Sequence, residues 1–404
     1  MSPRQIGGAL AAAATAVGSA ACAEVPRLPD GVTLSGGLVS ETAWSVSGPG
    51  RRVAKEAGQF DLGATIDAGE VLDVTGGTVQ ATITYRWGED LGAASGLRPQ
   101  QLVQEIYGRG QTWRLTQLWY QQAIGSSGAD LKVGRLTLGE DFATFRCAFQ
   151  NLTFCGSQPG NMESDDWYNW PVSQWGARGR YKRARGYVQL GLYEVNPRNL
   201  EKDFTVGRFK GATGVMIPVE AAWTPRIHGR AGRYRLGGWY DTSRAADLML
   251  DRKGQLRAVT GEAPKDGDGR GGAYVMAEQQ VTGPAEPAEA GSGVTLFFNA
   301  AQADRRTSRI DRQVYGGAFW RGPLGGRPRD ELGIAVGATR RNPRLRALTP
   351  DRIATEYVGE VFYAVRLNRA VALQPNVQLI ANPGGAPGRT AAIVGLKATA
   401  RLPP

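Results

Sequence analysis

Histidine and cysteine are scarce in this sequence, with one histidine and three cysteines among 404 residues. His228 is predicted to lie in a short turn, so no Ser-His or Cys-His catalytic set can be built around it. We therefore expect no enzymatic activity, no metal site and no cofactor. So few cysteines also suit a protein exported to an oxidising compartment of the cell envelope.

Long hydrophobic runs are also lacking, because only one segment approaches the roughly 20 apolar residues that a membrane-spanning helix requires. That segment, Ile6–Ala23, follows Arg4 and ends in Ala21-Cys22-Ala23. A positive start, an apolar run and small residues before the cleavage point are typical of a signal peptide. We expect residues 1–23 to be removed before Glu24, and 24–404 to form a single domain. A lipoprotein attached through Cys22 is the alternative.

Acidic residues are fewer than basic ones, 37 against 48, which gives a formal net charge of +11. Such a surplus favours anionic surroundings, which could be nucleic acid, lipopolysaccharide or a charged solute. The basic residues are scattered among strands and loops instead of gathering with aromatic residues. A nucleic-acid partner is therefore not expected.

What the sequence does have is a repeated alternation of apolar and polar residues. In 78–87 (TVQATITYRW), Val79, Ile83, Tyr85 and Trp87 belong to one row and the polar residues to the other. Successive side chains of a strand point to opposite faces, so this segment has one apolar and one polar face. In an outer-membrane β-barrel, lipid contacts the first face and water the second.

The alternation predicts about sixteen strands in an all-β, transmembrane, antiparallel barrel. The expected strands are 32–46, 58–68, 77–88, 113–123, 130–137, 174–182, 186–194, 212–223, 232–241, 272–282, 292–301, 313–321, 330–340, 354–366, 370–380 and 389–399. The gaps between them are alternately long and short, as in barrels with short periplasmic turns and long outer loops. A soluble β-sandwich gives no reason for this alternation.

Six stretches resemble the carbohydrate-selective porins of the OprB type. They are Leu118–Gln122, Leu131–Arg135, Asp141–Thr144, Gly232–Tyr240, Gly325–Gly333 and Leu373–Gly385. The last is the most specific, because it is a strand that ends in Asn-Pro-Gly-Gly. The similarity extends from about Leu34 to about Lys397, and it implies a sixteen-stranded outer-membrane channel for the diffusion of sugars.

The C-terminus departs from this family. Its members usually end on a strand with a final aromatic residue that the assembly machinery reads. This sequence ends Ala400-Arg401-Leu402-Pro403-Pro404. The departure concerns either the efficiency of assembly or the completeness of the C-terminus, and it does not change the expected fold.

The longest gap, 138–173, corresponds to the third outer loop, which in porins generally folds into the lumen and narrows it. It is rich in aromatic and charged residues. Aromatic rings can stack on a pyranose and charged groups can bond its hydroxyls. The candidates for this constriction are Glu140, Asp141, Phe142, Arg146, Asp165, Asp166, Trp167 and Trp170, with further aromatic residues at Phe145, Phe149, Phe154 and Tyr168. Alternatively, the aromatic residues only pack the loop against the barrel wall.

Cys147 and Cys155 lie eight positions apart in the same loop. We expect a disulfide between them, because the exported chain meets an oxidising compartment. Metal binding is the alternative, but no histidine lies nearby to complete a ligand set.

Strand parity gives the candidates for the pore wall. A charge on the lipid-facing side costs about 2–4 kcal/mol at the midplane, so charged residues on strands belong inside. The basic candidates are Arg86, Arg178, Arg180, Lys182, Arg233 and Arg235; the acidic ones are Asp61, Asp67, Glu220, Glu278, Glu356 and Glu360. The strand at 113–123 is ambiguous, because neither Arg114 nor Gln117 fixes its parity.

We interpret the chain as an outer-membrane porin of a Gram-negative bacterium for the passive diffusion of carbohydrates. The expected partners are sugar solutes, membrane lipid and lipopolysaccharide, and homo-oligomers are left open. A channel for acidic saccharides or other anions is one alternative. A barrel whose outer loops serve in adhesion is another.

Overall fold

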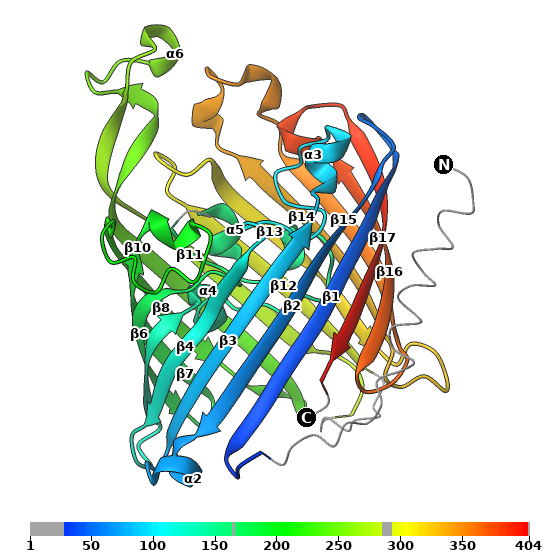
Figure 1. Cartoon of the computed structure of the whole chain (residues 1–404). Helices are drawn as coiled ribbons and strands as arrows, with labels where there is room; N and C mark the ends of the chain where they lie inside the picture. Colours follow the sequence, from blue (N-terminus) through cyan, green and yellow to red (C-terminus); the bar gives the residue numbers. More distant parts are fainter. Residues whose placement is uncertain (1–27, 164–165, 285–292, 403–404) are drawn as a thin grey trace.

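The chain forms a closed β-barrel (Figure 1). The computed structural model describes residues 28–163, 166–284 and 293–402. Neighbouring strands are antiparallel, and the first strand pairs with both the second and the last, which closes the sheet. The predicted all-β barrel of sixteen strands is confirmed.

Apart from β10 and β11, the sixteen long strands agree closely with the predicted ranges. They are β1 (Val32–Ser47), β2 (Ala54–Asp67), β3 (Gly77–Gly88), β4 (Trp113–Ala123), β5 (Ala129–Leu136), β6 (Gln174–Arg183), β7 (Gly186–Val195), β8 (Gly214–Trp223), β10 (Arg230–Asp251), β11 (Pro264–Gln280), β12 (Gly293–Ala303), β13 (Ile310–Arg321), β14 (Glu331–Arg341), β15 (Glu356–Arg366), β16 (Val371–Ala381) and β17 (Thr390–Arg401). A two-residue strand, β9 (Arg226–Ile227), pairs with the start of β10 in the turn that contains His228.

The helices are short and lie in the connections. They are α2 (Ala68–Leu72), α3 (Leu91–Ser95), α4 (Leu138–Asp141), α5 (Gln158–Met162) and α6 (Arg257–Thr260), with 3-10 turns η1 (Leu152–Phe154), η2 (Pro197–Leu200), η3 (Pro343–Leu345), η4 (Pro350–Arg352) and η5 (Pro383–Gly385). Among the described residues, none of these helices is both long and apolar enough to cross a bilayer.

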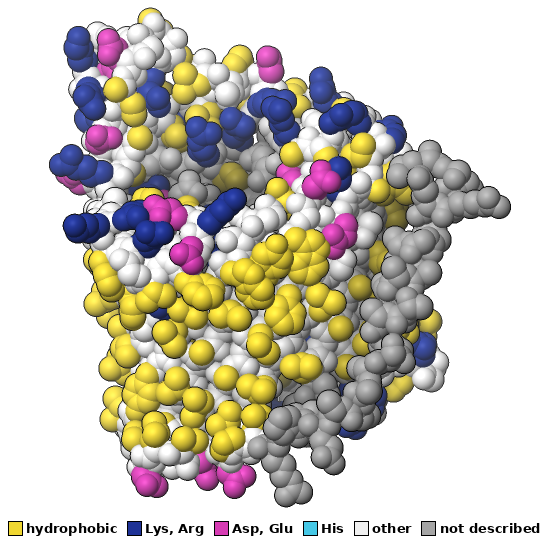
Figure 2. Space-filling view, viewed as in Figure 1, with side chains coloured by type: hydrophobic (Ala, Val, Ile, Leu, Met, Phe, Trp, Pro, Cys, Tyr) yellow, Lys and Arg dark blue, Asp and Glu magenta, His cyan; other side chains and the backbone are white. Residues whose placement is uncertain are grey.

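Strand β3 shows how the sequence produces the wall. Thr82, Thr84 and Arg86 are buried, whereas Tyr85 and Trp87 on the opposite face are partly exposed. The buried row is the polar one, as expected for an interior that carries solute. Figure 2 shows the other side of the wall as a belt of hydrophobic side chains, with Lys and Arg gathered above it.

Strand β4 changes parity part-way along its length. Gln117 pairs with Thr82 of β3, and Leu115 pairs with the following residue of β3, Ile83. Thr116 of β4 is therefore an extra residue with no partner position in β3. A bulge of this kind places residues of both parities on one face. This explains why neither Arg114 nor Gln117 fixes the parity in the sequence. In the structure Arg114 donates to Asn199 in the connection between β7 and β8, and Gln117 donates to Glu140 in the connection between β5 and β6.

Strands β10 and β11 are longer than predicted, and they form a hairpin that rises above the rest of the barrel (Figure 1). The sequence prediction ended the first strand at 241, began the second at 272 and left the rest as a loop. It was wrong because the outward face no longer meets lipid above the belt, so the apolar row that identifies the other strands is absent there.

The connection 137–173 between β5 and β6 carries the main hydrophobic core. Phe149 lies 4.9 Å from Phe362 of β15 and 5.2 Å from Phe154, measured between ring centroids. Phe145 lies 5.1 Å from Phe297 of β12. These rings attach the connection to the wall on the side of β12–β15.

Candidate functional site

Two wall carboxylates hold the connection 137–173 by its main chain. Glu360 of β15 accepts hydrogen bonds from the backbone nitrogens of Gln150 and Asn151, both at 2.8 Å. Glu220 of β8 accepts one from Ala143 at 2.9 Å. Bonds to a charged acceptor are stronger than neutral ones, so these carboxylates fix the connection at two points of the wall.

The connection that contains α3, residues 89–112, is held in the same way. Glu356 of β15 accepts a hydrogen bond from the backbone nitrogen of Gln100 at 2.9 Å, and it also accepts one from Gly384 of η5 at 2.6 Å. Glu41 of β1 accepts one from Ile106 at 3.3 Å. Strand parity predicts an interior position for Glu220, Glu356 and Glu360. In the structure, each of these carboxylates accepts hydrogen bonds from backbone nitrogens of the connections.

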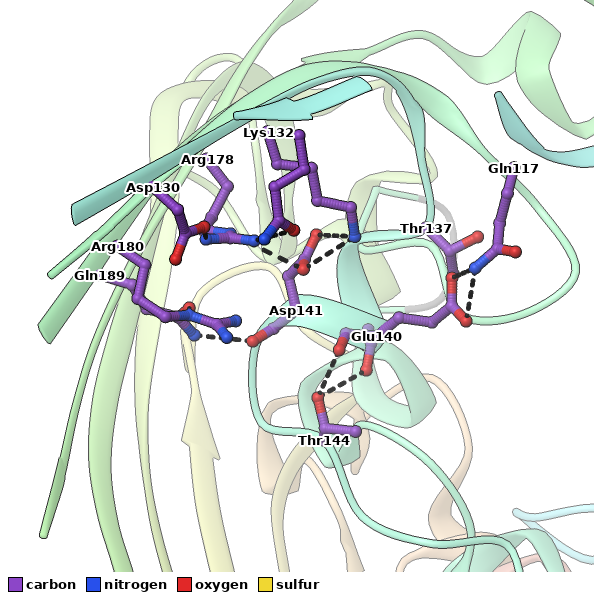
Figure 3. A network of polar contacts seen from close by, with 12 residues as sticks. Gln117, Asp130, Lys132, Thr137, Glu140, Asp141, Thr144, Arg178, Arg180 and Gln189 are labelled. Atoms are coloured by element: carbon purple, nitrogen blue, oxygen red, sulfur yellow. Dashed lines mark hydrogen bonds and ion pairs between the residues drawn. The ribbon is translucent and has the colours of Figure 1, made fainter. Parts of the chain in front are cut away.

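A polar network joins α4 to strands β5–β7, as seen in Figure 3. The Asp141 carboxylate accepts a hydrogen bond from Lys132 Nζ at 3.1 Å. It accepts another from the Tyr193 hydroxyl at 3.2 Å. Its backbone carbonyl accepts from Gln189 Nε2 at 2.6 Å. Arg178 pairs with Asp130 and lies 3.8 Å from Asp141. These charges are buried against one another and fill this part of the wall.

Glu140, the neighbour of Asp141, differs because its carboxylate is in contact with a cavity. Gln117 Nε2 donates to both carboxylate oxygens, at 3.0 and 2.9 Å (Figure 3). Burial raises the pKa of Glu140 to about 7, against the opposing effects of Lys132 and the Gln117 amide. This group can therefore change its charge near neutral pH.

Most aromatic residues of the connection pack against other side chains. Phe142, Phe149, Phe154, Trp167 and Tyr168 have no exposed surface, and Phe145 has almost none. Trp170 differs because it is only partly buried. Among the predicted aromatic candidates, Trp170 lines two cavities, whereas Phe145 lines one of them.

Two cavities meet beside Trp170. The first, of about 720 Å³, lies among the outer connections, and the second, of about 490 Å³, borders β1–β3 and β17. The residues common to both linings are Arg86, Glu105, Leu152, Asn169 and Trp170. We call this shared set the neck. It combines an aromatic ring with a cation, an anion and an amide.

Gln59 of β2 positions two members of the neck. Its Oε1 atom accepts hydrogen bonds from Arg86 Nε at 2.8 Å and from Trp170 Nε1 at 3.1 Å. The edge of the indole ring and the guanidinium are therefore held by one amide. Their orientation does not depend on a bound solute.

Lys397 of β17 holds another member of the neck, Glu105. Its Nζ lies 2.9 Å from the Glu105 carboxylate and 3.0 Å from that of Glu41. It also donates to the backbone carbonyls of Cys147 (3.3 Å) and Phe149 (3.4 Å). One buried ammonium thus joins the wall to the connections 89–112 and 137–173.

The other basic candidates occupy different surroundings. Arg180 donates to Gln189 at 2.8 Å, and Lys182 is exposed near the end of β6. Arg235 is buried and donates to the Thr144 carbonyl (2.6 Å) and to Glu278 (3.1 Å). Arg233 is exposed and borders a third cavity.

The remaining acidic candidates are also separated. Asp61 lines the 490 Å³ cavity, whereas Asp67 accepts from Gly69 N at 2.8 Å and begins α2 in a turn. Asp166 pairs with Arg270, and Arg146 pairs with Glu331 at 2.7 Å. Asp165 lies outside the described residues.

Sequence reasoning missed several residues of this region. Gln59 is uncharged, and Glu105, Leu152 and Asn169 lie in connections without a repeating pattern. Lys397 could have been found, because it alternates with Val394, Leu396 and Ala398 in a predicted strand. The same parity argument would have found Glu41 of β1.

Cys147 and Cys155 are joined by a disulfide that closes eight positions of the connection. The Glu105 carboxylate lies close to both sulfur atoms. Disulfide sulfurs are not thiolates, so this group of three residues does not offer a soft metal site.

We expect the variant Cys147→Ser/Cys155→Ser to fold into a barrel. Closing so short a loop contributes about 3 kcal/mol at most, and the sixteen strand pairings remain. Backbone hydrogen exchange in 147–155 should rise, while exchange in the strands stays unchanged. Mass spectrometry of the exported wild-type protein provides the check: free thiols at both positions would contradict the disulfide.

Comparisons with known proteins give a consistent result. Residues 51–402 match the family model described as carbohydrate-selective porin, OprB family. Porin B of Pseudomonas aeruginosa is 38% identical over 355 residues, which cover 81% of this chain and 77% of that protein. The putative porin QuiX of Acinetobacter baylyi is 30% identical over 391 residues, 88% of this chain and 85% of that protein.

A solved structure is similar over nearly the whole chain. The high-pH structure of Pseudomonas putida OprB has a TM-score of 0.87 and 35% sequence identity, and the match covers 92% of this chain and 94% of that chain.

Proposed function

This chain belongs to the OprB family of carbohydrate-selective porins, and we propose that sugars cross its channel at the neck. The protein is an outer-membrane channel for carbohydrates in a Gram-negative bacterium. Family membership indicates a channel instead of an enzyme. That the barrel has no catalytic activity at all is part of the proposal.

The observation that carries the proposal is the set of residues shared by the two cavities. An aromatic ring can stack on the apolar face of a pyranose, while Arg86, Glu105 and Asn169 can exchange hydrogen bonds with its hydroxyls. A solute that passes from one cavity to the other meets all of these groups. Many weak contacts replace lost hydration without holding the sugar too long for conduction.

The connection 137–173 supplies three residues of the neck, so we propose that it crosses the interior of the barrel and narrows it. Its hydrogen bonds to β8 and β15 and its aromatic contacts with β12 support this arrangement. These strands lie at separate places around the wall. A connection held at several such points can act as a fixed constriction.

Trp170→Ala tests the proposal through sugar block of the ion current in planar bilayers. Loss of the ring removes a stacking surface, so we expect the sugar concentration for half-block to rise by about fivefold, equivalent to ~1 kcal/mol. Trp113→Ala is the matched control, because Trp113 is exposed on β4 and stacks with Tyr85 of the outer face. Equal half-block concentrations in Trp170→Ala and the wild type would rule out the neck as the sugar contact.

Three further parts of the interpretation remain proposals. We propose that residues 1–23, which lie outside the described residues, are removed on export. The basic side chains above the apolar belt in Figure 2 support contact with lipopolysaccharide, whose phosphates are anionic. Assembly into homo-oligomers would use part of the same belt.

A further inference from the structure

A third cavity, of about 550 Å³, lies apart from the neck. Its lining comes from the ends of β10–β14 and from the turns that join them, on the side of the barrel where the turns are short. None of its lining residues belongs to the 720 or 490 Å³ cavities. Its volume falls within the range of ordinary small-molecule sites.

The segment 144–147 separates this cavity from the solute path. Thr144, Phe145 and Cys147 line the 490 Å³ cavity, whereas Arg146 between them lines the third cavity. The guanidinium of Arg146 lies 3.4 Å from the centroid of the Phe319 ring and 2.7 Å from a carboxylate oxygen of Glu331. The two compartments are therefore lined by opposite faces of the same segment.

Among the described residues, the charges that line the third cavity do not balance. Two described carboxylates line it, and each already has a partner. Glu331 pairs with Arg146, and Glu278 pairs with Arg235, whose side chain is only 2% exposed. Arg233 and Arg321 also line the cavity and have no ion pair with any described residue.

Polar groups without charge complete the lining. Thr295 of β12 and Gln280 of β11 lie opposite one another in the sheet and both border the cavity. A hydroxyl and an amide can bond the hydroxyls of a sugar. The lining thus has unpaired cations at its edge and neutral hydrogen-bonding groups beside them.

From this arrangement we propose that the third cavity is a binding site for an oxyanion, either free or carried by a sugar. Arg233 and Arg321 supply the charge-assisted hydrogen bonds. An arginine fork matches carboxylate, sulfate and phosphate alike, so the shared chemistry is a planar or tetrahedral group of anionic oxygens. Thr295 and Gln280 favour an oxyanion attached to a sugar ring over the free ion.

Isothermal titration of the full-length, detergent-solubilised barrel tests this site, with sodium sulfate and sodium glucuronate as the two probes. We expect both to bind, with glucuronate tighter. In Arg233→Ala/Arg321→Ala the binding of both probes should weaken by about tenfold or more, because two charged donors are lost. Both arginines are exposed, and heat-modifiable migration on gels checks that the variant remains folded.

The matched control is Arg208→Ala/Lys210→Ala, which removes the same charge from the connection between β7 and β8. A loss of binding in this control equal to that in the cavity variant would overturn the site, because net charge alone would then explain it. Unchanged binding in the cavity variant, or no binding of either probe to the wild type at millimolar concentrations, would also overturn it. The Trp170→Ala result does not bear on this test, so the two proposals fail separately.

Discussion

Replacing Arg86 by alanine is expected to lower the anion preference of the channel by roughly fivefold. An ion that passes within about 4 Å of a unit charge in a watery pore gains ~1 kcal/mol from it, which corresponds to about this factor. Arg86 is the basic member of the neck, and Gln59 holds its guanidinium in place. The neck also becomes wider, so single-channel conductance should rise.

The measurement is the reversal potential in a salt gradient across a planar bilayer. Arg86→Lys keeps the charge and should keep most of the anion preference. Arg183→Ala is a control in which the same charge is removed from an exposed position at the end of β6. Should Arg86→Ala and Arg183→Ala give the same reversal potential as the wild type, Arg86 would not lie at the narrow part of the path.

Glu360→Ala should release the connection 137–173 while the barrel remains closed. The substitution removes the acceptor of two backbone hydrogen bonds, from Gln150 and Asn151. Bonds to a charged group contribute about 1.5–3 kcal/mol each. The two amides would be left buried without that acceptor, so we expect this part of the connection to move away from β15.

Hydrogen exchange in 148–156 and noise of the open-channel current report the release. Both should increase in Glu360→Ala. Glu56→Ala serves as the control, because Glu56 accepts a hydrogen bond from Ser40 on β1 instead of from the connection 137–173. Unchanged exchange and noise in Glu360→Ala would mean that the aromatic contacts alone hold the connection.

The strands of the wall could be predicted from the sequence because the pattern that identifies each strand lies within that strand. Period-two alternation reports which face of a strand meets lipid, and it needs no knowledge of the neighbouring strands. It predicted an interior position for Arg86 and Glu360, and both side chains are buried in the structure. It failed at β4, where a bulge changes the parity, and beyond 241, where no lipid selects apolar residues.

Only part of the neck could be predicted, because one of its residues lies on a strand and the others lie in connections. Arg86 follows from strand parity, and Trp170 from the richness of its connection in aromatic residues. Glu105 and Leu152 are placed by contacts with distant strands, such as the ion pair of Glu105 with Lys397. The spacing of residues in the sequence does not indicate those contacts.

The position of Lys397 on the final strand has a consequence for the order of assembly. β17 pairs with β1, so the sheet cannot close until the last strand has been made and delivered. The same strand carries the ammonium that bonds Glu105 and the carbonyls of Cys147 and Phe149. Contacts between such distant parts of a chain form slowly. Closure of the wall and the final docking of the connections are therefore one event, and a nascent chain interrupted before β17 would lack both.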